Sequence, residues 1–127
     1  MKTTLVLAAA ACLAIAAPCA AQQALPGANV QQLLKNKRVS LACIDGTNGS
    51  GRYTMQKNSG TIQGSYTPPG RAPIADVGEV RAQGGSLCLK FKMLNGGAER
   101  CFQVSQTAPG KFNFAVSGVN ACNVSAS

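Results

Sequence analysis

The side chains that could do chemistry are few in this chain of 127 residues. It has no histidine, and its four carboxylates are Asp45, Asp76, Glu79 and Glu99. Without histidine the commonest general base is missing, and a Ser–His–Asp triad is impossible. A glycosidase would need two of the four acids to converge. Glu99 is instead expected opposite Lys92, and Asp45 belongs to a turn-rich loop where Asp is common. These residues predict a protein that is not an enzyme and that needs no cofactor.

The six cysteines divide into two groups. Cys12 and Cys19 lie in the N-terminal segment. The remaining four are Cys43, Cys88, Cys101 and Cys122. Zinc sites usually pair cysteines at short spacing and often add histidine. Here the spacings are long and histidine is absent, so the pattern favours two disulfides over a metal site.

The first 21 residues have the layout of a secretory signal peptide. A positive start precedes an uncharged apolar run over residues 5–17, and Pro18 ends that run before a cleavage site after Ala21. The run is shorter than the roughly 20 residues of a membrane-spanning helix. Lipid attachment at Cys19 is the other alternative, and Pro18 directly before it fits such a site poorly. We expect residues 22–127 to form one periplasmic or secreted bacterial domain, without a transmembrane segment.

From Val39 onward, short alternating segments between glycine-rich and proline-rich turns predict an all-β protein. We expect an antiparallel meander, or a closed or curled barrel, of about six or seven strands. A loose lead-in at residues 22–28 would precede a short helix over Asn29–Lys35. The buried face of that helix would be Val30, Leu33 and Leu34. Small barrels usually fill their centres with side chains, so the sequence offers no support for an interior ligand.

The Asn95-Gly96 pair marks the clearest hairpin, because Asn-Gly favours a two-residue turn in which both φ angles are positive. That turn would make Cys88 and Cys101 diagonal neighbours, too far apart for a disulfide. A bulge, or a four-residue turn over Met93–Gly96, would bring the two cysteines directly opposite each other.

The disulfide pairing follows from the expected order of the strands. Cys43 lies in the first strand and Cys122 in the last, and these strands become neighbours if the sheet closes. Four cysteines allow three connectivities. Of these we favour Cys43–Cys122 together with Cys88–Cys101.

The charge balance indicates the kind of partner. Loss of Lys2 with the signal would leave eleven of the twelve Lys and Arg against four acids, a net charge of +7. Such a surface favours anionic partners, such as anionic lipid, lipopolysaccharide or polysaccharide. The alternative is a solvated face that only keeps the domain soluble. Only Tyr53 and Tyr66 are candidates for exposed aromatic residues, which are too few for specific nucleic-acid binding. The candidate binding residues are Lys90, Lys92, Arg100, Arg52 and Tyr53. A second basic cluster is Lys35, Lys37 and Arg38.

Five short stretches carry a resemblance. They are Gly51-Arg52-Tyr53, Thr61-Ile62-Gln63-Gly64, Gly78-Glu79-Val80, Leu87-Cys88 and Cys101-Phe102-Gln103-Val104. Together they resemble a class of small exported proteobacterial proteins of unknown function, in which Trp would stand at the position of Val80. The resemblance implies a small β-sheet protein with disulfides, and it brings no catalytic residues.

A second similarity involves a possible inhibitory loop. Ser50-Gly51-Arg52-Tyr53-Thr54 is similar to the Ser-Gly-x-x-Tyr loop of periplasmic lysozyme inhibitors, which are also small β-barrels with disulfides. The chain would then inhibit a secreted hydrolase through residues 49–53, although a basic inhibitor would repel a basic lysozyme. The preferred hypothesis is an exported, non-enzymatic binding domain for an anionic envelope or extracellular partner.

Overall fold

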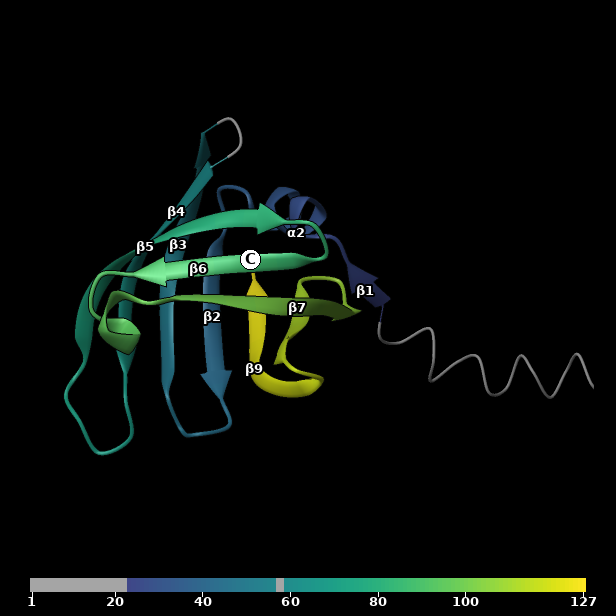
Figure 1. The fold of residues 1–127 in the computed structure, drawn as a ribbon. Coiled ribbons are helices and arrows are strands. Elements are labelled where there is room, and N and C mark those ends of the chain that lie inside the picture. The colour runs from purple at the N-terminus through teal and green to yellow at the C-terminus, as the bar shows by residue number, and fades with distance from the viewer. Residues whose placement is uncertain (1–22, 57–58) are drawn as a thin grey trace, which may run out of the picture.

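The computed structural model describes residues 23–56 and 59–127. The predicted signal peptide lies outside these residues. In the described part of the chain, nine strands form one antiparallel sheet, and eight of them close into a barrel (Figure 1). The prediction of an all-β barrel with a short helix and two disulfides is confirmed, with eight strands instead of six or seven.

The strands of the barrel follow one another as antiparallel hairpins. The elements are β1 (Gln23–Leu25), α2 (Gly27–Leu34), β2 (Arg38–Cys43), β3 (Asn48–Gln56), β4 (Ser59–Thr67), β5 (Ile74–Gln83), β6 (Ser86–Phe91), the 3-10 helix η1 (Leu94–Gly97), β7 (Glu99–Ala108), β8 (Lys111–Val116) and β9 (Val119–Ala126). Pairing of β9 with β2 closes the barrel.

The two ends of the barrel differ. Because successive strands alternate in direction, the connections β2–β3, β4–β5, β6–β7 and β8–β9 all lie at one end, which we call the mouth. At the other end, the base, α2 packs against β5, β6 and β7, and Figure 1 shows it beside the end of β5.

Among the described residues, no helix combines the length and the apolar character that a membrane-spanning helix needs.

Helix α2 begins earlier than the sequence predicts. It starts at Gly27 instead of Asn29, because Pro26 holds the extended conformation of an N-cap residue, with φ −60° and ψ 149°. The Pro26 carbonyl then accepts a hydrogen bond of 3.2 Å from the N–H of Val30. Val30 is fully buried, but the prediction for Leu33 is wrong, since 37% of it is exposed on the outer side of the helix.

Two segments that were expected to be irregular are strands. Residues 23–25 of the predicted lead-in form β1 by pairing with β7. Residues 48–51, predicted as part of a turn-rich loop, are the first residues of β3. Glycine serves close packing here, because a Cβ at Gly51 would lie 2.8 Å from the carbonyl oxygen of Gln63 on β4.

The β6–β7 hairpin turns more widely than a bare Asn-Gly turn. Asn95 and Gly96 have positive φ, as predicted, but Gly97 does too. Cys88 therefore lies directly opposite Cys101, which is the register that the four-residue turn implied. The two registers differ by two residues, and a shift of two keeps every side chain on its face of the sheet.

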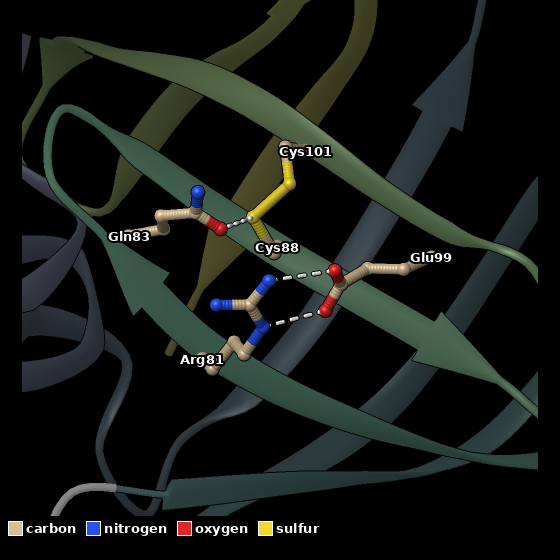
Figure 2. The surroundings of a disulfide bond; sticks show 5 residues. All are labelled: Arg81, Gln83, Cys88, Glu99 and Cys101. Atoms are coloured by element: carbon tan, nitrogen blue, oxygen red, sulfur yellow. Dashed lines mark hydrogen bonds and ion pairs between the residues drawn. A yellow bond between two sulfur atoms is a disulfide. The ribbon is translucent and has the colours of Figure 1, made fainter.

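Both predicted disulfides are present, and they lie on opposite sides of the barrel wall. Cys43–Cys122 joins β2 to β9 at the seam, and both cysteines line the barrel interior. Cys88–Cys101 joins β6 to β7 on the outer face. Figure 2 shows this outer bond beside three polar side chains, Arg81, Gln83 and Glu99.

The hydrophobic core fills the base. It consists of Val30, Leu34, Val39, Tyr53, Val80, Leu87, Val104, Phe112, Phe114 and Val124. The ring of Tyr53 lies over Gly60, where any larger residue would collide with it. Among the described residues the buried Tyr53 hydroxyl has no hydrogen-bond partner. Burial raises the pKa of Tyr53, so its hydroxyl stays protonated at neutral pH.

Removing the hydroxyl of Tyr53 and removing that of Tyr66 should change the stability of the protein in opposite directions. Tyr53→Phe removes a buried hydroxyl without a partner, so we expect the free energy of unfolding to rise by about 1 kcal/mol. Tyr66→Phe is the matched control: its hydroxyl donates to Asp76 at 3.3 Å, and we expect a loss of about 1–2 kcal/mol. Urea unfolding of the protein with both disulfides formed measures each change. Destabilisation by Tyr53→Phe would show that its hydroxyl is satisfied.

Candidate functional site

The barrel interior is not completely filled. A cavity of about 140 Å³ extends from the core to the mouth. Its wall is mostly apolar and includes Leu41, Ile62, Leu89, Phe102 and the Cys43–Cys122 disulfide. At the mouth its lining becomes polar, with Asp76, Asn95 and Arg100.

Glycines at inward-facing positions form part of the cavity wall. Gly51 and Gly64 are paired across β3 and β4, and both line the cavity. At Gly78 the missing side chain is replaced by the ring of Phe91, which would lie 2.7 Å from a Cβ there. At Gly51 and Gly64 no aromatic ring takes that place, and a Cβ would instead collide with the backbone of the neighbouring strand. The two strands therefore approach closely at this pair, and no side chain from it enters the cavity.

Asp76 is a buried carboxylate at the mouth, 7% exposed. Its Oδ1 accepts a hydrogen bond from the N–H of Val77 at 2.8 Å. Its Oδ2 accepts three more, from the hydroxyl of Tyr66 at 3.3 Å and from the N–H groups of Met93 and Leu94 at 3.2 Å each. The carboxylate thereby holds the β6–β7 loop against the end of the barrel.

The hydrogen bonds also decide the charge state of Asp76. Burial is the largest single influence and raises the pKa of Asp76, but the donors Val77, Met93, Leu94 and Tyr66 together outweigh it. The pKa of Asp76 thus lies below its ordinary value. The carboxylate is ionised at neutral pH and fully occupied by donors from the protein.

The three predicted binding cations of the β6–β7 hairpin do not form one surface. Lys90 lies on the outer face opposite Glu99, the position where the sequence placed Lys92. Lys92 is exposed at the start of the loop. Arg100 lies opposite Leu89 on the inward-facing row of β7 and lines the cavity at the mouth.

The other two predicted binding residues are separated by the barrel wall. Arg52 is exposed on the outside of β3, whereas Tyr53 is 1% exposed and belongs to the core. The expectation that Tyr53 and Tyr66 are exposed aromatics is wrong, since Tyr66 is also buried. The expected loop at Gly49–Tyr53 is a strand segment paired on both sides. This stretch therefore offers no exposed loop for inhibiting a hydrolase.

A basic cluster lies outside the barrel near the base. It consists of Lys35, Lys37, Arg38 and Arg52, all exposed. Arg38 and Arg52 are directly opposite each other on β2 and β3, and the Nη1 of Arg52 donates to the carbonyl of Asn36 at 3.3 Å. Within residues 23–56 and 59–127, the only ion pair is Arg81–Glu99, so the cluster has no acidic partner there.

The four carboxylates do not converge. Asp76 lies inside the barrel, Glu79 and Glu99 point outward, and Asp45 is exposed in the β2–β3 loop. Glu99 accepts two hydrogen bonds of 2.7 Å from Arg81 (Figure 2), which lower its pKa. These positions give none of the paired geometry that glycoside hydrolysis requires.

Among the described residues, one cluster contains side chains of the types that can bind a metal ion. Ligand atoms of Cys88, Glu99 and Cys101 lie within 4.8 Å of one another. The two sulfurs are bonded to each other, whereas a cysteine binds zinc only as a free thiolate. Glu99 is also occupied by Arg81, so this group does not fit a metal ion.

The sequence predicts neither the structural role of Asp76 nor the cavity. The donors to Asp76 include the N–H groups of Met93 and Leu94, which belong to a turn distant in the sequence. Two inward-facing glycines, Gly51 and Gly64, line the cavity, but that they lie opposite each other follows from the pairing of β3 with β4 and cannot be read from either strand alone.

Comparison with known proteins shows few similarities. No protein-family model matches the chain, and no curated protein matches it. One similar solved structure is a redesigned β-barrel, mFAP1, bound to DFHBI, with 19% identity and a TM-score of 0.46 over 76% of this chain and 95% of that one. Another is EF1p2_mFAP2b bound to DFHBI, with 16% identity and a TM-score of 0.45 over 79% of this chain and 95% of that one.

Asp76 makes the free energy of unfolding of the protein depend on pH. Its folded pKa lies below the unfolded value of about 3.9. Its contribution is therefore complete above that pH and is lost as the pH falls through the folded pKa. We expect Asp76→Asn to lower the free energy of unfolding at pH 7 by about 1–3 kcal/mol and to flatten its decline below about pH 4.

The matched control for Asp76 is Asp45→Asn, because Asp45 also accepts a backbone hydrogen bond, from Thr47 at 2.8 Å, but is exposed. Denaturant unfolding between pH 3 and pH 7 compares the two variants. An equal loss from both would contradict a special role for the buried carboxylate.

Proposed function

We propose that this protein is a non-enzymatic binding domain that holds a small, mainly apolar ligand inside its barrel. The observation that carries the proposal is the apolar cavity of about 140 Å³ that reaches the mouth. The two disulfides are compatible with the exported location that the sequence predicts.

The cavity is unusual for so small a barrel. Protein interiors are packed about as densely as organic crystals, and a void of this kind lowers stability by leaving its walls without contacts. A ligand that fills the space restores those contacts. The cavity is lined by core residues as far as Leu34 of α2, so an unfilled interior of this kind favours a binding role for the inside of the barrel.

The reactive groups of the chain favour binding over catalysis. The four described cysteines are joined in disulfides, and histidine is absent from the sequence. Of the four carboxylates one is buried and one lies in a loop, and the two that share the outer face, Glu79 and Glu99, both lie beside Lys90. Asp76 is the one carboxylate beside the cavity, and its hydrogen bonds come from the protein itself. The group holds a loop in place and is not available as a general base.

Benzene tests the cavity directly, because an engineered cavity of about 150 Å³ lined by similar side chains binds benzene. We expect benzene to shift the backbone amide resonances of cavity residues in ¹H–¹⁵N spectra. Leu41→Phe should abolish these shifts, because the larger ring occupies the space. Ala42→Phe is the matched control, since Ala42 is exposed on the outside of the same strand.

Each result of this experiment bears on the proposal. Saturable shifts that Leu41→Phe removes and Ala42→Phe retains would support it. Shifts that are absent, or equal in both variants, would contradict it. Circular dichroism checks that the variants fold, and Leu89→Phe serves as a second filling variant from another strand.

A second candidate function is attachment to an anionic surface, the partner expected from the net charge. The exposed cluster of Lys35, Lys37, Arg38 and Arg52 supports it, because four cations without an acidic neighbour in the described chain create a positive field. We expect binding to vesicles that contain phosphatidylglycerol, weakening as salt is raised.

The double variant Arg38→Gln with Arg52→Gln should weaken this binding by more than Lys90→Gln with Lys92→Gln, which removes the same charge from the hairpin. Co-sedimentation over a salt series measures both. Binding that is insensitive to salt, or equal in the two double variants, would contradict attachment through the cluster.

A further inference from the structure

We propose that the ligand of this barrel is a small carboxylic acid, with its apolar body in the cavity and its carboxylate paired with Arg100 at the mouth. The inference rests on the proposed interior binding site. It adds the chemical class of the ligand, the end by which the ligand enters and the residue that selects it.

The cavity wall decides where a charged group of the ligand can lie. Its lining farther from the mouth is apolar and includes Leu34, Val80 and Leu87. Burying an ion among such side chains without a partner is costly. A charged ligand must therefore keep its ionic group at the mouth, where polar side chains begin.

Two charged residues line the cavity, and they differ in what already binds them. Asp76 is buried and accepts four hydrogen bonds from the protein. Arg100 is exposed, and among the described residues its guanidinium has no ion pair. The group free to take a ligand is the cation, and its fork of donors matches a carboxylate.

The other charges at the mouth also favour an anion. Arg71 lies in the β4–β5 loop and Lys92 in the β6–β7 loop, and both are exposed. The exposed acids at this end are Asp45, which accepts a hydrogen bond from Thr47, and Glu99 at the start of β7, which is paired with Arg81 on the outer face. Asp76 opposes an anion, but it lies on β5, and β6 separates that strand from Arg100 on β7.

The cavity volume limits the size of the apolar body. A cavity of about 150 Å³ accommodates benzene, which has six carbon atoms, and the volume here is about 140 Å³. The ligand is thus a short-chain or single-ring acid. A long fatty acid would leave most of its chain outside the barrel.

The test compares hexanoate with 1-hexanol, which shares the apolar body and lacks the charge. Isothermal titration calorimetry of the protein with both disulfides formed should show hexanoate binding about tenfold more tightly. Arg100→Gln should remove this preference and leave the affinity for hexanol within about twofold. Lys111→Gln, which removes an exposed cation from β8, should change neither affinity. Arg100→Lys should restore part of the preference, because it keeps the charge and loses the fork.

Chain length gives a second measurement. Affinity should rise by about fourfold per methylene from butanoate to hexanoate and then level off towards decanoate, because each methylene contributes only while it fits into the cavity.

The outcomes separate the two proposals. Equal binding of hexanoate and hexanol, or a preference unchanged in Arg100→Gln, would overturn the assignment of Arg100 and leave the cavity proposal intact. The same holds if benzene binds and neither hexanoate nor hexanol does. If none of the three compounds binds, the interior site itself is wrong.

Discussion

Closure of the barrel between its first and last strands is the constraint on which the rest of the structure depends. β2 and β9 pair along their length, and the Cys43–Cys122 disulfide joins residues 79 positions apart at this seam. A cross-link over so long a loop restricts the unfolded chain strongly. Without closure there would be no inside, because the inward-facing rows of the sheet would lie on an open surface. The core and the cavity are both products of this seam.

Different structural elements lie at the two ends of the barrel. At the base, α2 covers the opening and supplies Val30 and Leu34 to the core. At the mouth, the β6–β7 loop with its short 3-10 helix η1 lies beside the interior, and in the described part of the chain no α-helix covers this end. That loop is held by one buried carboxylate, Asp76, through the N–H groups of Met93 and Leu94. A buried charge persists only when it is well paired, so the same contacts that keep Asp76 ionised also order the rim of the cavity.

Glycine and aromatic residues together shape the interior. Rings lie over Gly60 and Gly78 and fill the space that these residues leave. The Gly51–Gly64 pair has no such ring, and both residues line the cavity. The cavity wall is apolar farther from the mouth and polar at the mouth, where its charged groups lie. This gradient makes a ligand with an apolar body and a polar end the best complement to the site.

The sequence by itself determined the all-β class, most of the strands and the pairing of the four cysteines in the domain. These depend on alternation, turn residues and strand order, which are local or follow from the order of elements. Only the tertiary structure decided that Tyr53 is core, that Lys90 and Arg100 lie on opposite faces, and that Asp76 binds a loop from another hairpin. The cavity belongs to this second group. Its existence depends on how eight curved strands bring their inward residues together, and no single strand carries that information.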